Sequence, residues 1–512
     1  MKKITSQVED SGVAMSELPL VWLRSFLREL ESNELDILLM VTVSVVVVVE
    51  ILGILSAVDA VMKARTSQGA IAWIVLLLLF PFVVLPFYWV FGRTKFHGYL
   101  IARRTGGTEV QLRVAEWLES YCDEFQVELA APMSRFRVCE TLAHLPFTGA
   151  NSVELLVDGQ RTFEAIFEGI DEAQDYILVQ FFIVKDDQIG RELKRKLIEK
   201  VAQGVKVRFL FDEVGSHRLS RRYLRELTDA GVQVKRFFST KGRRNRFQIN
   251  FRNHRKIVVI DGHTAYVGGA NVGDEYLGRS KRFGAWRDTH VCVQGPCVAG
   301  IQLAFAEDWH WATCEVVQDL DWTVWRTDDP GLDVLVLPTG PADELETCGL
   351  FFTHAIHAAQ RRLWIASPYY VPNDDVQTAL QLAALRGVDV RILLPAKPDH
   401  YSPYLSSFAF IDESEPAGVK FYRYEAGFLH QKVMLVDDDF AAVGTANLDN
   451  RSFQLNFEIT IAIADNQFAD QVEQMLRVDF DRSCRVLPGQ LAHRPFWFRL
   501  AVRLARLLAP VQ

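Results

Sequence analysis

The sequence predicts an α/β protein with two similar halves related by pseudo-twofold symmetry and preceded by a transmembrane helical hairpin. Two apolar stretches lie before residue 92, and one short motif occurs first at His254 and again at His430. A chemical cluster that recurs in a repeated α/β unit favours two halves that build one site together. The predicted parts are an N-terminal extension (1–34), the hairpin (35–92), a linker region (93–145), a first half (146–330), a second half (331–490) and an amphipathic C-terminal helix (491–512).

The composition excludes several classes of protein. Of 512 residues, 49% are apolar and 23% charged, which is typical of folded chains and excludes a disordered or collagen-like protein. The seven cysteines form no C-x-x-C pair and have no metal-ligand spacing. We therefore predict reduced thiols rather than a disulfide framework.

The two apolar stretches, residues 37–58 and 70–91, are each long enough to cross a membrane. At about 1.5 Å per residue each reaches about 33 Å, against a hydrocarbon core of about 30 Å. Neither shows the polar stripe of a soluble helix, and the one charged residue is Glu50. Glu50 has two interpretations, an intramembrane functional group or the partner of a polar group on the second helix.

Basic residues near the two stretches indicate the orientation of the hairpin. Six flank its outer ends and two lie in the connection, namely Arg24, Arg28, Arg93, Lys95, Arg103 and Arg104 against Lys63 and Arg65. Positive charge favours the cytoplasmic side. The sequence thus predicts a multi-pass anchor with both ends in the cytoplasm.

From about residue 150, short apolar runs alternate with helical stretches. A strand, a helix and a strand are predicted in the first half, and the same order recurs in the second half, at 176–184, 189–203, 205–211, 363–366, 376–385 and 388–394. Both helices end at a glycine, Gly204 and Gly387, followed by a Val-x-Val-Arg strand. The local pattern therefore supports the repeat.

The motif itself has the spacing His-x-Lys-x4-Asp. The segment from His254 to Asn271 aligns without a gap on the segment from His430 to Asn447, with eight of eighteen positions identical. Alternate residues of a strand share a face, so His254 and Lys256 point the same way. Each copy of the motif is therefore expected to present its histidine and lysine side by side.

The aspartate of each motif is predicted to lie elsewhere. At about 3.3 Å per residue, Asp261 is about 16 Å beyond Lys256 and faces the opposite side, so Asp261 and Asp437 are expected in turns with a structural role. Reversal of the chain at these turns is expected to pair His254 with Asn271 and His430 with Asn447.

The expected cluster suits the binding and reaction of a phosphodiester. It contains the two histidines, two lysines (Lys256 and Lys432) and two asparagines (Asn271 and Asn447). Lysine supplies positive charge, asparagine donates hydrogen bonds, and histidine acts as a nucleophile or an acid and base. A metal site is not expected, because the cluster lacks carboxylates and its ammonium groups repel a cation. Asp288 and Glu458, each just before an apolar strand, could orient the histidines, or could serve as helix caps or surface acids.

Four stretches of the sequence are recognisable, namely Asn253-His-Arg-Lys-Ile-Val-Val-Ile-Asp-Gly, Trp286-Arg-Asp-Thr-His, Ser367-Pro-Tyr-Tyr-Val-Pro and Asn447-Leu-Asp-Asn-Arg-Ser. In these stretches the chain resembles the phospholipase D superfamily. In detail it is similar to bacterial cardiolipin synthases with two N-terminal membrane helices, from about residue 37 to 510. The residues before the first membrane helix, and Glu50 within it, depart from that pattern.

The resemblance implies phosphatidyl transfer between two phosphatidylglycerol molecules, which gives cardiolipin and glycerol without a metal or other cofactor. His254 would attack phosphorus to form a phosphatidyl-histidine, while His430 acts as acid and then as base. Lys256, Lys432, Asn271 and Asn447 would hold the phosphoryl oxygens. The family motif also groups Asp261 and Asp437 with the catalytic residues. The implied location is the bacterial inner membrane, with the catalytic halves in the cytoplasm.

Two further segments could meet anionic membrane lipid. Residues 496–508 place Arg499, Arg503 and Arg506 on one helical face and apolar side chains on another, although an ordinary packed terminal helix would look similar. Residues 216–256 hold thirteen Lys or Arg against two acids, which could steer lipid headgroups or simply be solvated surface.

Two alternatives use the same residues. A membrane-anchored phospholipase D, or a phosphatidylserine-type or other phosphatidyltransferase, would transfer to water or another alcohol. A nucleic-acid phosphodiesterase or binding protein could use the basic segment, but the membrane anchor argues against a nucleic-acid partner. The expected partners are phosphatidylglycerol and anionic membrane lipid, with no prediction of oligomeric state.

Overall fold

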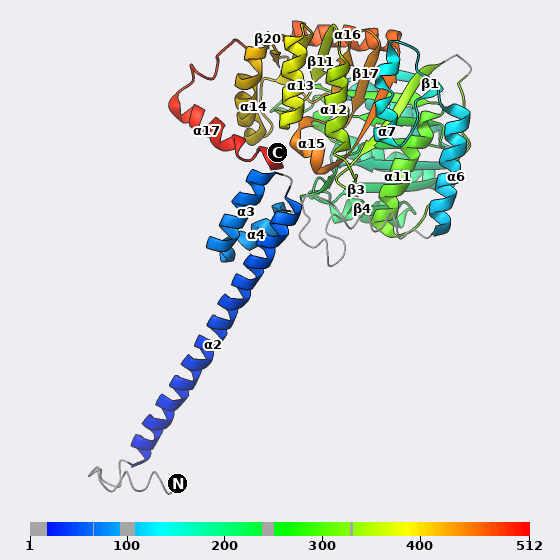
Figure 1. The fold of residues 1–512 in the computed structure, drawn as a ribbon. Helices are drawn as coiled ribbons and strands as arrows, with labels where there is room; N and C mark the ends of the chain where they lie inside the picture. Colours follow the sequence, from blue (N-terminus) through cyan, green and yellow to red (C-terminus); the bar gives the residue numbers. More distant parts are fainter. Residues whose placement is uncertain (1–17, 65, 93–107, 238–249, 328–330) are drawn as a thin grey trace. The chain divides into compact units, whose positions relative to one another are not determined.

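A computed structural model describes residues 18–64, 66–92, 108–237, 250–327 and 331–512 (Figure 1). The chain divides into two compact units, residues 1–93 and residues 94–512. Each unit is described by itself below.

The first unit contains helices α2 (Leu18–Lys63), α3 (Ser67–Leu79) and α4 (Pro81–Phe91). Helix α2 continues through residue 35, so the expected boundary between an extension and a membrane segment is not a break in the helix. Its part Asp36–Lys63 has a mean hydropathy of 2.8 and is long and apolar enough to cross a membrane. Among the described residues it is the one helix that meets this test.

The second apolar stretch is not the single spanning helix that the sequence predicted. It is divided at Phe80, whose backbone leaves the helical region, and Pro81 begins the next helix. Proline has no N–H to donate and clashes with the preceding turn, so it is favoured at a helix start and disfavoured inside. With 13 and 11 residues, α3 and α4 reach about 20 and about 17 Å at about 1.5 Å per residue.

Both short helices pack against α2. A Cβ atom at Gly53 would lie 2.9 Å from the Leu77 carbonyl oxygen and 3.0 Å from Pro81 Cβ, so this glycine allows the close approach. Farther along α2, the Tyr88 hydroxyl donates a hydrogen bond of 2.9 Å to Asp59. The polar partner of the second stretch is therefore Asp59, whereas Glu50 lies exposed on α2.

The second unit is built on one large mixed sheet. Its strand order is symmetric about the antiparallel pair β1 and β10, with β9-β7-β6-β2-β3-β4 on one side and β19-β17-β16-β11-β13-β14-β20 on the other. The predicted α/β fold with two similar halves is confirmed. The strands are β1 (Thr148–Val157), β2 (Tyr176–Phe181), β3 (Lys206–Asp212), β4 (Gln233–Phe237), β6 (Ile257–Ile260), β7 (Thr264–Gly268), β9 (Thr289–Gln294), β10 (Leu332–Thr339), β11 (Arg362–Ala366), β13 (Asp389–Pro395), β14 (Lys420–Tyr424), β16 (Val433–Val436), β17 (Phe440–Gly444), β19 (Asn456–Ala464) and β20 (Ser483–Arg485).

Short strands join the halves near the motifs. Strand β5 (Arg252–Asn253) of the first half pairs with β19, and β8 (Trp286–Arg287) pairs with β15 (Phe428–Leu429) of the second half. Strand β12 (Tyr370–Val371) pairs with β18 (Leu448–Asp449). Because β5 and β15 end directly before His254 and His430, each histidine enters the site from a strand paired with the opposite half.

Helices cover both faces of the sheet (Figure 1). In the first half, Ile177 and Val179 of β2 pack with the helices of one face, while Leu178 packs with α11 on the other, as alternation along a strand requires. The helices are α8 (Asp158–Glu172), α9 (Gln188–Ala202), α10 (Arg221–Asp229), α11 (Cys297–Thr313), α12 (Thr347–Ala358), α13 (Asp374–Leu385), α14 (Tyr401–Ser414), α15 (Asn450–Gln454), α16 (Asn466–Asp481) and α17 (Phe496–Arg506), with 3₁₀ turns η3 (Asp274–Leu277), η4 (Glu415–Ala417) and η5 (Ala509–Val511).

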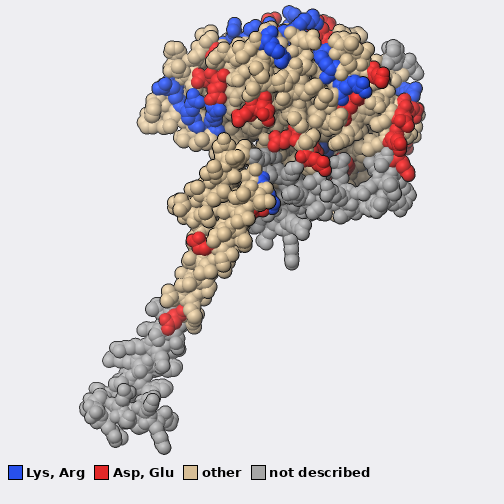
Figure 2. Space-filling model, viewed as in Figure 1, with Lys and Arg blue, Asp and Glu red and all other residues tan. Residues whose placement is uncertain are grey.

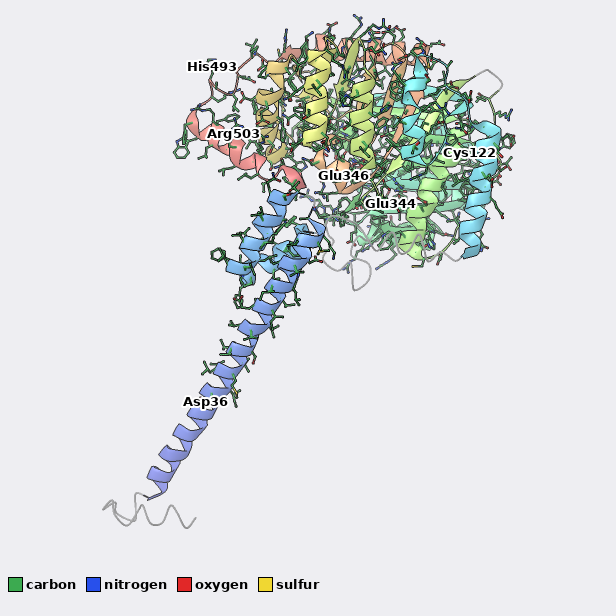
Figure 3. The ribbon with its side chains drawn as sticks, viewed as in Figure 1. Asp36, Cys122, Glu344, Glu346, His493 and Arg503 are labelled. Carbon is green, nitrogen blue, oxygen red and sulfur yellow. The ribbon has the colours of Figure 1, made fainter. Side chains whose placement is uncertain are left out.

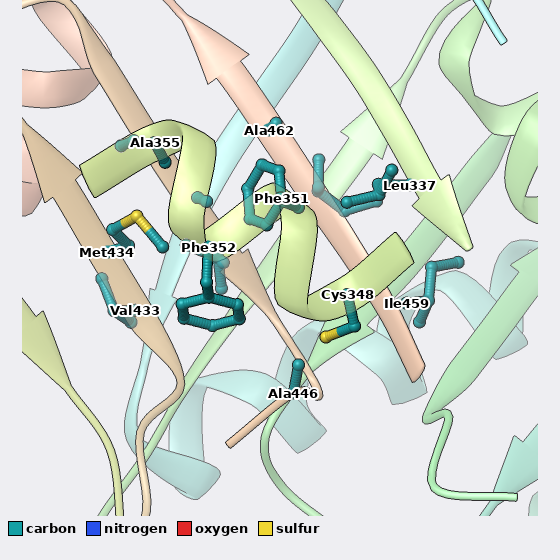
Figure 4. Close-up of a cluster of buried hydrophobic side chains, with 14 of the residues drawn as sticks. Leu337, Cys348, Phe351, Phe352, Ala355, Val433, Met434, Ala446, Ile459 and Ala462 are labelled. Atoms are coloured by element: carbon teal, nitrogen blue, oxygen red, sulfur yellow. The ribbon is translucent and has the colours of Figure 1, made fainter. Parts of the chain in front are cut away.

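The hydrophobic core of the second half packs against β16, the strand that carries its copy of the motif. Phe352 of α12 lies beside Val433 and Met434 of β16, and all three are buried (Figure 4). These strand residues follow Lys432 directly. The packing therefore fixes the strand from which the lysine extends.

The expected linker region, 93–145, requires a correction. Its described part forms α6 (Thr108–Phe125), a 3₁₀ turn η1 (Met133–Phe136) and α7 (Val138–Ala143). Phe136 is fully buried and stacks on Phe440 with ring centroids 3.8 Å apart. Arg135 forms ion pairs with Asp437 and Asp439. Residues 108–143 are thus a packed part of the second unit.

Candidate active site

The two motifs lie in equivalent hairpins, β6–β7 and β16–β17. Their register is one residue from the predicted one, because Ile257 pairs with Val267 and Val433 with Val443. The first turn is a three-residue loop in which Asp261 and Gly262 have positive φ angles of 51° and 72°. Left-handed residues are typical of such loops, whereas the predicted reversal about Gly262 and His263 would leave an even number of residues in the turn. The expected pairs of histidine with asparagine are therefore wrong in detail.

The two aspartates lie in the turns and bind backbone. Asp261 accepts three short hydrogen bonds from the N–H groups of Gln174, Asp175 and Tyr176, at 2.7, 2.8 and 2.7 Å. Asp437 binds the equivalent loop of the second half, through the N–H groups of Gln360, Arg361 and Arg362. These contacts connect each hairpin to the start of β2 or β11. The strand arithmetic predicted the position in the turns but not these partners.

Each histidine is hydrogen-bonded to a carboxylate from the opposite half. His254 Nδ1 lies 2.9 Å from a Glu458 oxygen, and His430 Nδ1 lies 2.8 Å from an Asp288 oxygen. Both carboxylates are almost fully buried, which excludes the alternative of a surface acid. With Nδ1 bound, the other ring nitrogen, Nε2, is the one that can react.

Glu458 has further support. It accepts hydrogen bonds from the Thr445 hydroxyl at 2.6 Å and from Asn456 Nδ2 at 3.0 Å. Burial alone would raise the pKa of this carboxyl, but His254 and Lys256 outweigh burial and lower the pKa. Asp288 behaves likewise, because His430 and Lys432 lower its pKa against the effect of burial. Both groups are therefore ionised and can hold an imidazole ring in one orientation.

The lysines lie beside the histidines, as strand alternation predicted. Lys256 Nζ donates to the His254 carbonyl oxygen at 2.6 Å, and Lys432 Nζ bonds the equivalent carbonyl of His430. Burial lowers the pKa of Lys432 to about 8 and the pKa of Lys256 well below its usual value. The charge of Lys432 also lowers the pKa of Lys256. An anion bound beside these two lysines would favour their charged forms.

The two histidines belong to this same charge cluster. Burial lowers the pKa of His254 to about 4, with contributions from both lysines, and burial also lowers the pKa of His430, with Lys432 next in importance. Both rings are therefore neutral near pH 7. A neutral ring can be a nucleophile, and a bound phosphate anion would raise both pKa values.

The two asparagines differ. Both polar atoms of Asn271 are engaged by the protein, because its Oδ1 accepts from the Ile183 N–H at 3.0 Å and its Nδ2 donates to the Tyr276 hydroxyl at 2.7 Å. Asn447 Oδ1 is buried and has no hydrogen-bond partner among the described residues. Asn447 thus keeps a whole acceptor atom free for a ligand that donates a hydrogen bond.

Sequence reasoning missed the aromatic walls of the site. The Phe182 ring lies 4.9 Å from the His254 ring, and the Tyr276 and Trp286 rings lie 5.7 and 5.5 Å from the His430 ring. These aromatic residues lie just after β2, in η3 and in β8. Their positions next to these elements were the signal in the sequence that could have revealed them. Among the described residues, no three His, Cys, Asp or Glu side chains are grouped as a metal ion would need.

Comparison with known proteins agrees with this geometry. Residues 166–285 and 352–480 match the family described as cardiolipin synthase, PLD-like domain, and residues 51–93 match the phospholipase D-nuclease N-terminal family. Cardiolipin synthase A of Pseudomonas putida W619 is 48% identical over 468 residues, which cover 90% of this chain and 97% of that protein. The chain belongs to the cardiolipin synthase family.

Further similarities fit this membership. Cardiolipin synthase A of Pseudomonas entomophila L48 is 47% identical over 470 residues, covering 90% of this chain and 97% of that one. The crystal structure of a phosphatidylserine synthase from Haemophilus influenzae Rd KW20 has a TM-score of 0.56 at 17% identity and covers 74% of this chain and all of that one. The latter similarity concerns the fold, which this cardiolipin synthase family member shares with the wider phospholipase D superfamily.

Proposed function

We propose that the protein is a phosphatidyltransferase that makes cardiolipin and glycerol from two phosphatidylglycerol molecules. The observation that carries this proposal is the crossed pair of imidazoles, His254 on Glu458 and His430 on Asp288, with a buried lysine beside each histidine. Two reactive nitrogens around one anion-binding position suit a reaction that replaces one ester of a phosphodiester with another.

In the first step, His254 Nε2 attacks the phosphorus of one phosphatidylglycerol. A P–N bond forms while the bond between phosphorus and the headgroup glycerol oxygen breaks. His430, protonated once the anionic substrate has raised its pKa, donates its proton to that oxygen, so glycerol leaves neutral. Lys256 and Lys432 stabilise the charge that develops on the phosphoryl oxygens.

In the second step, His430 removes the proton from a glycerol hydroxyl of the second phosphatidylglycerol. The resulting oxygen attacks phosphorus, the P–N bond breaks and His254 is regenerated. One phosphodiester replaces another, so no nucleotide is consumed and the covalent intermediate divides a difficult exchange into two displacements.

The acceptor of the phosphatidyl group distinguishes cardiolipin synthesis from hydrolysis and from transfer to another alcohol. With phosphatidylglycerol labelled in the headgroup, cardiolipin synthesis by the full-length protein in liposomes releases half of the converted label as glycerol and keeps half in cardiolipin. Phosphatidic acid without cardiolipin would mean hydrolysis, and a new phospholipid with added serine would mean another transferase. Cleavage of DNA in a parallel reaction would identify a nuclease. His254→Ala is the matched inactive control in every arm.

We place this enzyme in the bacterial inner membrane with residues 94–512 in the cytoplasm. The basic residues Arg93, Lys95, Arg103 and Arg104 follow the last apolar helix and support this orientation. A reporter enzyme that folds only outside the cytoplasm, fused after Gln512, should be inactive in cells.

A further inference from the structure

The last helix of the chain, α17, has an unusually apolar exposed face. Val502 and Ala505 are buried, and Phe498 packs edge-on against Phe408 of α14 at a centroid distance of 5.2 Å. On the other side, six large apolar side chains are 37% to 75% exposed, namely Phe496, Trp497, Leu500, Leu504, Leu507 and Leu508. An exposed cluster of this kind in a soluble domain commonly marks an interaction surface.

Helical geometry separates this face from the packed one. At about 100° per residue the six exposed side chains fall within an arc of about 120°, and the arc is centred about 150° from the mean direction of Phe498, Val502 and Ala505. The apolar face is therefore turned away from the domain rather than loosely packed against it.

The arginines of α17 lie beside this face but serve different purposes. Arg506 forms an ion pair with Glu413 of α14, and Arg503 lies 3.5 Å from Asp412 and 3.6 Å from Glu413. Figure 3 labels Arg503 on α17, and Figure 2 shows basic and acidic side chains close together at this edge of the second unit. Arg503 and Arg506 thus hold the helix in place, whereas Arg494 and Arg499 are exposed and can meet an anionic surface.

The chain end after α17 is bound to the active-site loops. Asn450, three residues after Asn447, donates to the Ala509 carbonyl oxygen at 3.1 Å. Arg451 bonds the Val511 carbonyl oxygen at 3.2 Å and also the Asn250 carbonyl oxygen at 2.8 Å, four residues before His254. The exposed apolar face is therefore anchored to the loops of both halves that carry the reacting residues.

We infer that the exposed face of α17, residues 496–508, docks on the surface of an anionic lipid bilayer and holds the active site at the level of the lipid headgroups. Three features specify a bilayer as the occupant: the apolar arc, the exposed arginines Arg494 and Arg499, and the connection to a site whose substrate is itself a membrane lipid. This last point rests on the proposed function. A second copy of the chain is the competing occupant.

The test uses the full-length variant Trp497→Ser/Leu504→Ser/Leu507→Ser in phosphatidylcholine liposomes. Long-chain phosphatidylglycerol in the same bilayer should be used about fivefold to tenfold less well, as judged by kcat/KM, because the site no longer rests on the headgroups. Dihexanoyl phosphatidylglycerol supplied as monomers in solution should be used as by the unmodified protein. The matched control is Leu382→Ser/Leu385→Ser, two exposed leucines of α13, which should change neither rate.

The remaining outcomes overturn the inference in distinguishable ways. Unchanged use of both substrates would show that the face has no part in catalysis at a membrane. An equal loss with both substrates would show that α17 merely supports the site. A smaller assembly of the triple variant on sedimentation in detergent would assign the face to a second copy. Absence of cardiolipin synthesis from both lipids by the unmodified protein would instead refute the proposed function.

A second inference concerns the first unit, where α3 and α4 form a hairpin along one end of α2. Leu77 and Pro81, at the tip, both lie against Gly53. Tyr88 reaches back to Asp59, and its ring lies 5.3 Å from that of Trp73 in the middle of α3. The chain thus descends from Lys63 to the level of Gly53 and returns to the level of Asp59.

The tip of this hairpin reaches only half-way into a membrane. Gly53 is ten residues from Lys63, which is about 15 Å at about 1.5 Å per residue, against a hydrocarbon core of about 30 Å. The turn leaves little backbone unpaired, because the Phe80 N–H bonds the Leu76 carbonyl oxygen and Pro81 has no N–H. Such a break is tolerated where protein surrounds it, and α2 lies directly beside it.

We infer that α2 crosses the membrane once, that α3 and α4 form a re-entrant hairpin, and that the two ends of the chain lie on opposite sides. The charges fit this arrangement. Six basic residues then share one side with the second unit, namely Lys63, Arg65, Arg93, Lys95, Arg103 and Arg104. The side of residues 1–35 keeps Arg24 and Arg28 near the membrane.

Epitope tags at the two ends test this topology. In spheroplasts, added protease should remove a tag before Met1 and leave a tag after Gln512 intact, whereas lysed spheroplasts should lose both. Protection of both tags would restore the simple two-helix hairpin. Loss of both in intact spheroplasts would place the second unit outside and overturn the orientation drawn from the charges.

Discussion

The two copies of the motif contain the same reacting residues in different surroundings. His254 packs against Phe182 and is held by Glu458, which Thr445 and Asn456 also support. His430 packs against Tyr276 and Trp286, and the ammonium group of Lys432 lies 3.0 Å from the same nitrogen that binds Asp288.

The same residue types can therefore have different roles in the two copies of the motif. Glu458 is the strongest influence that offsets burial at His254, whereas at His430 the charge of Lys432 adds to the effect of burial on the pKa and Asp288 opposes both. Equivalent substitutions in the two copies should therefore give different variants, and the following predictions measure how different.

The largest effect is expected for His254→Ala. This variant lacks the proposed nucleophile, and His430 is already needed as acid and base, so transfer should fall at least about 10³-fold while the protein remains folded. The measurement is cardiolipin formation per folded molecule, with the circular dichroism spectrum and thermal midpoint as controls. Residual activity above a few per cent of the unmodified rate would mean that His254 is not the nucleophile.

His430→Ala should be almost as severe but chemically distinct. Solvent can protonate the departing glycerol slowly, whereas the second step then lacks its base, so a phosphatidyl group should accumulate on His254. Intact-protein mass spectrometry after exposure to phosphatidylglycerol detects this adduct. An adduct on His430 in the His254→Ala variant would reverse the two roles.

A smaller difference is expected within one motif, between Lys256→Ala and Asp261→Asn. Loss of the buried ammonium group should lower the rate about 10²–10³-fold with little change in fold, as for other donors that stabilise developing negative charge. Asp261 instead binds three backbone N–H groups, so Asp261→Asn should keep most activity per folded molecule and lower the thermal midpoint. Equal inactivity of two well-folded variants would contradict the structural assignment of the aspartate.

The sequence was sufficient for the parts of the site that depend on local spacing. Strand alternation placed Lys256 beside His254 and sent Asp261 to the turn, and the gapless repeat predicted two halves. It could not predict which carboxylate serves which histidine, because the crossed pairing arises from β5 joining β19 and β15 joining β8 across the two halves. Such contacts between distant segments leave no trace in local periodicity.

The membrane segment was mispredicted for a different reason. Hydropathy and length measure whether a stretch tolerates lipid, not whether it is one continuous helix. Pro81 lies at the middle of residues 70–91 and was the visible signal of a break. The packed residues 108–143 were likewise misjudged, since burial of Phe136 depends on its stacking with Phe440 some 300 positions later.

The smallest and most specific difference should appear between Asn447→Ala and Asn271→Ala. Asn271 joins Ile183 to Tyr276, so its loss should lower the thermal midpoint by a few degrees and loosen the wall beside His430. Asn447 Oδ1 is buried without a partner, so removing it costs the free protein nothing and should leave the midpoint unchanged or slightly higher. If a group of the substrate donates a hydrogen bond to Asn447 Oδ1, Asn447→Ala should lower kcat/KM about tenfold. Per folded molecule, this loss should be larger than the loss caused by Asn271→Ala. Parallel melting curves and initial rates decide the matter: a destabilised Asn447→Ala with normal rates would make the two asparagines equivalent supports.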